Sequence, residues 1–204
     1  MIYIERENEP EFWSQYQKKH PGADYDDLNK TEEGKEVRKR IREFNIDQQH
    51  GLRAYCCKRI TIDDSVNEHI KPRGRYSDLS MKYSNIVASC REDGTNRTCS
   101  ASKRDQYDEH HFISPLELDC EAQFRFYRTG EIISETANGN YTIGLLNLNS
   151  YKLCKARKAK LKECESYCND DLVREYFLKP DEQNKLEPYV DIIRFFYTSP
   201  KEFE

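Results

Sequence analysis

The segment from Ala54 to Lys103 constrains the fold most, because two strand-like runs and one helix start lie there between spaced cysteines. The first run, residues 66–70, contains a glutamate followed directly by a histidine and ends before a Lys-Pro pair. The second run, residues 85–89, begins with an asparagine, and a turn at 93–96 separates it from a Cys-x-x-x-Lys sequence. Short apolar runs bounded by turn residues predict the order strand, loop, strand, helix.

The flanking segments predict helices and one hairpin. Val37, Ile41 and Phe44 recur at helical spacing after Asn29, which can cap that helix with Glu32 three residues later. Gly and Pro end or interrupt these patterns, which sets the expected boundaries. We expect helices over residues 9–19, about 30–49, 150–168 and 182–197, a short strand at 60–62, a hairpin over 121–133 and a small-residue loop at 137–140.

Composition limits the classes of protein. Aromatic residues make up 12% of the 204 residues and supply core area, which argues against disorder. No apolar run approaches the roughly 20 residues that span a bilayer, and the first residues lack a signal-peptide pattern, so we expect a cytoplasmic protein. The net charge of −4 gives no global attraction to nucleic acid, so such binding would rest on local basic patches. The lysines and arginine of residues 152–162 form one such patch or, equally well, a solvated helix face.

Eight cysteines without a secretion signal indicate thiols or metal ligands rather than disulfides. Cys56, Cys90 and Cys99 frame the two strand-like runs, and Cys57 is a candidate fourth ligand for a structural Zn²⁺ ion. Buried reduced thiols are the alternative. Cys164 and Cys168 are spaced as two thiols on one helix face.

The acid–histidine pair suits phosphodiester hydrolysis. His69 is a candidate general base, since the unperturbed pKa of imidazole lies near neutrality. Glu68 offers the oxygen ligand that Mg²⁺ prefers. The amide of Asn85 can hydrogen-bond the connecting loop and aim His69. Neighbours on a strand point to opposite faces, so the strand must end or bend at this pair.

The order of these residues resembles the HNH (ββα-metal) endonuclease superfamily. More specifically, the sequence resembles the HNH (PtuB-like) subunit of bacterial Septu-type and retron-associated anti-phage systems. The resemblance includes Asn67–Pro72, Asn85–Cys90, Cys99–Lys103 and, further on, Ile113–Pro115 and Thr142–Asn149. It implies an α+β fold with three parts: an N-terminal helical segment (1–50), an HNH ββα-metal core with zinc-binding thiols (51–110), and a hairpin plus C-terminal helical region (111–204).

The resemblance also implies roles for residues. His69 would be the general base, Glu68 a ligand of a divalent metal such as Mg²⁺, and Asn85 the residue that fixes the loop. The sequence departs from the family at two positions. Arg53 replaces the family's first zinc-binding cysteine, and Ser100 replaces its last metal ligand. We expect Asp105 to be the substitute ligand beside Ser100. The residues expected to contact phosphates are Lys71, Arg73, Arg75 and Lys103.

The resemblance implies partners as well: an SMC/ABC-like ATPase subunit (PtuA-like), and in retron systems a reverse transcriptase with its RNA–DNA hybrid. The chain contains no Walker A pattern, so it does not supply that ATPase. The expected activity is metal-dependent endonuclease cleavage by a defence effector, with DNA as the default substrate and a structured RNA such as tRNA as the other. The alternative is a catalytically degenerate adaptor or nucleic-acid-binding subunit.

Overall fold

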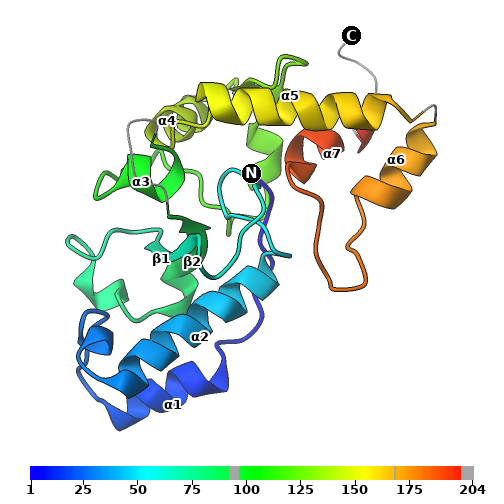
Figure 1. Ribbon diagram of the computed structural model, residues 1–204. Coiled ribbons are helices and arrows are strands. Elements are labelled where there is room, and N and C mark those ends of the chain that lie inside the picture. Colours follow the sequence, from blue (N-terminus) through cyan, green and yellow to red (C-terminus); the bar gives the residue numbers. More distant parts are fainter. Residues whose placement is uncertain (92–96, 168, 199–204) are drawn as a thin grey trace.

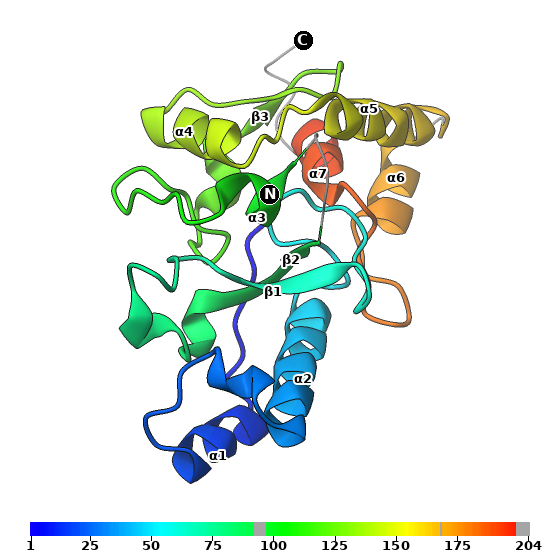
Figure 2. The same cartoon turned by 60° about the vertical axis from the view of Figure 1, so that its left-hand side comes forward.

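The computed structural model describes residues 1–91, 97–167 and 169–198 of the chain. Two N-terminal helices form one layer, a small β-hairpin the next, and a group of C-terminal helices the third, in both views (Figures 1 and 2). The expected α+β class is confirmed. No helix in the described ranges is long and apolar enough to cross a membrane.

Helices α1 (Glu11–Lys19) and α2 (Glu32–Gln48) form the N-terminal layer. As predicted, Val37 and Ile41 are buried on one face of α2, which packs against the hairpin. The predicted cap at Asn29 is wrong. The side chain of Thr31 accepts a hydrogen bond from the Gly34 amide instead, because the chain first makes a 3-10 turn at Asp27–Asn29.

The central hairpin pairs β1 (Ser65–His69) with β2 (Ile86–Cys90) in antiparallel register, His69 opposite Ile86. Every residue of β2 is buried, since α2 and α3 (Cys99–Lys103) both contact it. The predicted order of strand, loop, strand and helix is confirmed. The predicted turn at 93–96 lies outside the described residues.

The C-terminal layer begins with the predicted hairpin, β3 (Arg125–Phe126) paired with β4 (Ile132–Ile133). The amide of Asn149 bonds both the backbone N–H and the carbonyl of Ile132 at 2.8 Å, which ties this hairpin to the following helix. The helices of this layer, seen at the top of Figure 1, are α4 (Ala137–Leu145), α5 (Tyr151–Glu165), α6 (Asp170–Phe177) and α7 (Val190–Thr198).

Three expectations about local structure are wrong. Residues 60–62 form no strand, because the Asp64 carboxylate accepts from the backbone N–H of Thr61 and closes a turn. Residues 137–140 begin α4 rather than a loop, because the Thr136 side chain caps the helix at Gly139. The last helix starts at Val190 rather than 182, and α6 was not predicted.

Candidate active site

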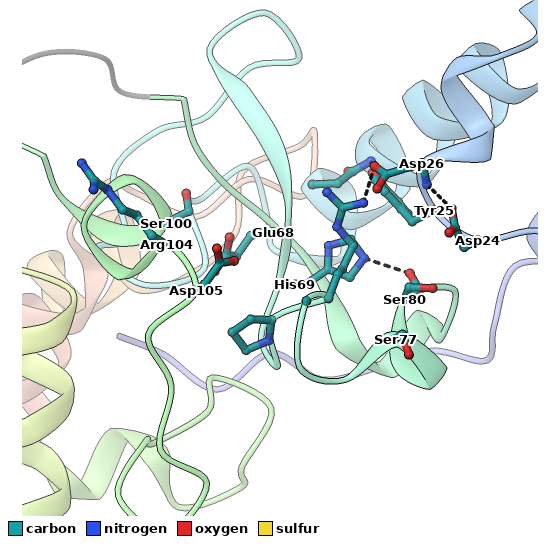
Figure 3. A pocket seen from close by; sticks show the side chains of 14 residues that line it. Asp24, Tyr25, Asp26, Glu68, His69, Ser77, Ser80, Ser100, Arg104 and Asp105 are labelled. Atoms are coloured by element: carbon teal, nitrogen blue, oxygen red, sulfur yellow. Dashed lines mark hydrogen bonds and ion pairs between the residues drawn. The ribbon is translucent and has the colours of Figure 1, made fainter.

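A cavity of about 520 Å³ lies at the end of β1. Figure 3 shows that its walls come from the loop before α2, from β1 with its following loop, and from the end of α3. Both members of the predicted acid–histidine pair line it, because β1 ends at His69. The residues that line it are Asp24, Tyr25, Asp26, Asn67, Glu68, His69, Pro72, Arg73, Gly74, Ser77, Ser80, Ser100, Arg104 and Asp105.

His69 is buried, with only 7% of its surface exposed. Its Nε2 atom lies 2.8 Å from the carbonyl oxygen of Ser80 (Figure 3). A carbonyl only accepts, so Nε2 carries the proton and Nδ1 keeps the lone pair. Burial lowers the pKa of His69 to about 4, so the imidazole is neutral at physiological pH.

Tyr25 packs edge-on against His69, with the ring centroids 4.5 Å apart. Its hydroxyl accepts a hydrogen bond of 2.6 Å from the Asn67 amide. Next to it, the Asp26 carboxylate pairs with Arg73 at 2.5 Å. Tyr25 and Asp26 were not predicted, since nothing in the polar stretch between the two helices indicates that it folds over a distant strand end.

Asn85 ends the turn before β2 and makes three hydrogen bonds to the loop that follows β1. Its Oδ1 atom accepts from the backbone N–H of Lys71 at 2.8 Å. Its Nδ2 atom donates to the carbonyls of Lys71 at 3.0 Å and Leu79 at 3.2 Å. Because Ser80 follows Leu79 directly, these bonds also hold the carbonyl that orients His69.

Glu68 points to the other side of β1, where its carboxylate accepts from the Lys103 ammonium at 2.8 Å. Lys103 is 1% exposed and also donates to the carbonyl of His69 at 3.0 Å. Burial raises the pKa of Glu68, against the attraction of Lys103. Lys103 was expected to contact phosphates. That expectation is wrong for this conformation, because the side chain is buried against Glu68.

Ser100 and Asp105 line the same cavity, but their local environments differ. The Ser100 hydroxyl donates to the carbonyl of Cys90 at 3.0 Å and to Ser89 at 3.1 Å. Asp105 lies beyond the end of α3, because Arg104 takes a positive φ of 50° and turns the chain. Glu68 and Asp105 line the same part of the cavity (Figure 3), and the negative charge of Asp105 adds to the rise that burial causes in the pKa of Glu68.

Metal ligands are sparse in this cavity. Among the described residues, no group of three His, Cys, Asp or Glu side chains could enclose a metal ion. Mg²⁺ commonly uses only one or two carboxylates and completes its shell with waters and substrate phosphates. Glu68 and Asp105 therefore fit an open Mg²⁺ site and do not fit a closed protein cage.

The thiols form a different arrangement from the four-ligand zinc site. Cys56, Cys90 and Cys99 are buried together, and the hydrogen bond with Cys99 lowers the pKa of Cys56 to about 7. Cys57 lies elsewhere, near the Met1 amino group and Asp191, because its positive φ of 55° turns it away. Cys57 is thus not a fourth ligand.

Arg53 occupies the remaining side of this thiol cluster. Its guanidinium donates to Asp64 at 2.9 Å, and only 3% of the residue is exposed. Burial opposes its charge, but the negative charge of Cys56 and the Asp64 carboxylate raise the pKa of Arg53. A buried cation stands where a zinc ion would need a ligand, so these residues do not fit a structural zinc.

The other basic residues expected at phosphates lie around the loop after β1. Arg73 lines the cavity and pairs with Asp26. Lys71 lies 3.7 Å from Glu109, and Arg75 donates to the carbonyl of Tyr107 at 2.7 Å. Of the four basic residues expected at phosphates, Arg73 alone lines the cavity, and its ion pair with Asp26 is accessible to solvent.

Comparison with known proteins gives one informative match. The chain is 31% identical over 137 residues to a protein of Vibrio cholerae serotype O1 biovar El Tor. That relative is named the retron Vc95 putative HNH endonuclease. The match covers 62% of this chain and 65% of the relative, so the chain spans less than two thirds of the protein it matches. No protein-family model matches the chain.

Proposed function

We propose that this protein is a metal-dependent HNH endonuclease that hydrolyses phosphodiester bonds as the effector of a retron or Septu-type defence system. The observation that supports it best is the hydrogen bond between His69 and the carbonyl of Ser80. That contact leaves the lone pair on Nδ1, burial keeps the imidazole neutral, and Glu68 and Asp105 line the same cavity. A general base in an open, polar cavity is what water activation at phosphorus requires.

In the proposed reaction, Nδ1 of His69 takes a proton from the attacking water. The proton on Nε2 stays bonded to Ser80, so the ring keeps its orientation while Nδ1 changes charge. Asn85 maintains this geometry through its three bonds to the loop. Arg73, once released from Asp26, is placed to contact a substrate phosphate.

A divalent cation such as Mg²⁺ would be held by Glu68 and Asp105, with substrate oxygens and water completing its shell. It would neutralise the negative charge that develops at phosphorus and on the leaving oxygen. Ser100 would be a weaker metal ligand, and its hydroxyl already donates a hydrogen bond to the carbonyl of Cys90.

The proposed partners are an SMC/ABC-like ATPase and, in a retron, the reverse transcriptase with its RNA–DNA hybrid. The name of the Vibrio relative, a retron protein, supports the retron partners. The ATPase rests on the sequence resemblance alone. A nuclease with an exposed catalytic cavity endangers its host unless a partner restrains it, which favours a regulated assembly.

The test is a cleavage assay on plasmid DNA and total tRNA, with Mg²⁺, Mn²⁺ or EDTA, and with and without a candidate ATPase partner. We expect metal-dependent cleavage that His69→Ala abolishes. His111→Ala is the matched control, because His111 is half-exposed and pairs with Asp108 outside the cavity. Equal cleavage by the wild type and His69→Ala would refute the assignment.

A second candidate is a degenerate adaptor that binds nucleic acid without cutting it. It is favoured by the ion pair between Glu68 and Lys103, which occupies one oxygen of the proposed metal ligand. Absence of cleavage by folded protein under every condition above, together with retained nucleic-acid binding, would support this candidate.

A further inference from the structure

A second groove, of about 400 Å³, lies where α2 crosses the start of β1. Three arginines line it: Arg38 and Arg42 from α2, and Arg91 from the residue after β2. Lys35 and Lys39 stand at its rim and are neutralised by Glu32 and Glu43 on the same helix.

Among the residues that the structure describes, the three arginines have no such acidic partner. Arg38 donates to the Asn29 side chain and to the Tyr25 hydroxyl, both uncharged. Arg42 donates to the carbonyl of Ser65 at 3.2 Å, and its buried Nε atom has no hydrogen-bond partner. No ion pair joins any of the three to a carboxylate within residues 1–91, 97–167 and 169–198.

This concentration of positive charge is unfavourable without an anion. Burial lowers the pKa of Arg42, and the neighbouring charges of Arg38 and Arg91 lower it further, against Tyr25 and Glu43. Several other surface cations have a carboxylate partner, as Lys19 has Glu33 and Arg128 has Glu165. An uncompensated cluster of guanidinium groups with an unused donor is suited to phosphate oxygens.

The groove leads to the catalytic cavity. Ser65 and Val66 of β1 line the groove, and Asn67, Glu68 and His69 line the cavity. Val66 and His69 are three strand residues apart, which is about 10 Å along β1. Tyr25 and Asn67 form the boundary: the Tyr25 hydroxyl contacts Arg38, and Asn67 donates to the Arg38 carbonyl at 2.8 Å.

We propose that the Arg38–Arg42–Arg91 groove binds the backbone phosphates of the nucleic-acid strand that runs into the His69 cavity. The inference rests on the proposed function and adds to it a binding site for the flanking strand. Apart from Val66 the groove is lined by charged and polar side chains, and we assign its arginines to phosphate oxygens, which every nucleic-acid sequence shares. It would therefore position substrates without sequence preference.

The test measures binding without cleavage, in EDTA, with His69→Ala protein. Fluorescence anisotropy would follow short labelled single-stranded DNA, duplex DNA and RNA over about 50 to 200 mM salt. Arg91→Gln, Arg42→Gln and the double variant are compared with Arg40→Gln. Arg40 is the matched control because it is on the same helix, carries the same charge and lies over the Phe12 ring, outside the groove.

We expect each groove variant to weaken binding about three- to tenfold, and the double variant more than either. The slope of log affinity against log salt should fall by about 0.7 to 0.9 for each lost contact, and Arg40→Gln should leave it unchanged. Because Arg91 is exposed, Arg91→Gln should keep the melting temperature of its parent. Affinities and slopes equal to those of Arg40→Gln, or no binding of any probe by the parent, would overturn the proposal.

The two proposals fail separately. Wild-type cleavage that the groove variants leave unchanged would refute the groove and retain the nuclease. Groove-dependent binding by a protein that never cleaves would retain the groove and support the adaptor.

Discussion

The Nε2 atom of His69 and the backbone carbonyl oxygen of Ser80 lie 2.8 Å apart. This contact determines which imidazole nitrogen is protonated, and burial sets the pKa below which the ring becomes charged. Both properties follow from the loop between β1 and β2, which folds back over the strand end. The protonation state of His69 can therefore be measured directly, without an assay of activity.

Titration of His69 is the first prediction. Burial disfavours the imidazolium and lowers the pKa to about 4, so the ring stays neutral as pH falls through 6.5 and gains its proton only near 4. NMR titration of the imidazole signals of metal-free protein, with His69 identified by its loss in His69→Ala, checks this. An unperturbed titration near 6.5 would show that the ring is solvated.

Replacement of Tyr25 should change that titration. The ring of Tyr25 covers His69 edge-on and keeps water from it. We expect Tyr25→Ala to admit water and move the pKa of His69 up toward its ordinary value. Tyr25→Phe keeps the covering ring and loses only the hydroxyl with its contacts to Asn67 and Arg38, so its titration should stay near the wild type. Equal titrations for Tyr25→Ala and wild type would mean that other groups exclude the water.

Loss of the Asn85 amide should destabilise the loop. Asn85→Ala leaves one N–H and two carbonyls without their partner, which should cost about 1 to 3 kcal/mol in the free energy of unfolding. Asn138→Ala is the control, since Asn138 makes one exposed bond to the carbonyl of His110 and should cost about 0.5 kcal/mol or less. Urea unfolding measures both. Similar costs would remove the loop-fixing role of Asn85.

The buried pair of Glu68 and Lys103 should behave as a coupled unit. Glu68→Gln leaves a buried ammonium without its counter-charge, and Lys103→Met leaves a buried carboxylate. We expect each to cost about 3 to 5 kcal/mol and the double variant much less than their sum. Urea unfolding of the four proteins gives the coupling energy. Additive effects would show that the two charges are independently solvated.

Sequence reasoning located the parts of the site that are contiguous in the chain. The strand-like runs at 66–70 and 85–89 and the helix start at Cys99 are local patterns, and the structure has a strand, a strand and a helix there. Tyr25 and the arginine groove depend on how α2 docks onto the hairpin, a tertiary contact with no local signal. A lysine in a polar helix is predicted to be exposed, because lysines are rarely buried unless they are paired. The burial of Lys103 therefore needed the structure.

Arg53 allows a test of the thiol cluster. The guanidinium lies beside Cys56 and Cys90 and bonds Asp64, so a cation of the protein takes the place of a metal. We expect wild-type protein to contain no stoichiometric zinc, and its melting temperature to be the same with and without EDTA. Mass spectrometry of metal content and thermal unfolding check this. About one zinc ion per chain, with a loss of stability in EDTA, would contradict it.

Arg53→Cys should reverse the behaviour. The substitution removes the buried charge and puts a fourth thiol beside Cys56, Cys90 and Cys99, and four thiolates are a donor set that Zn²⁺ accepts. We expect this variant to bind zinc and to become more stable with it, because a metal that binds only the folded chain stabilises it. Arg53→Ser is the matched control, because it also removes the ion-pair partner of Asp64 but adds no thiol. Zinc should therefore not change the melting temperature of Arg53→Ser. A zinc response shared by the Ser and Cys variants would mean that the metal binds outside this cluster.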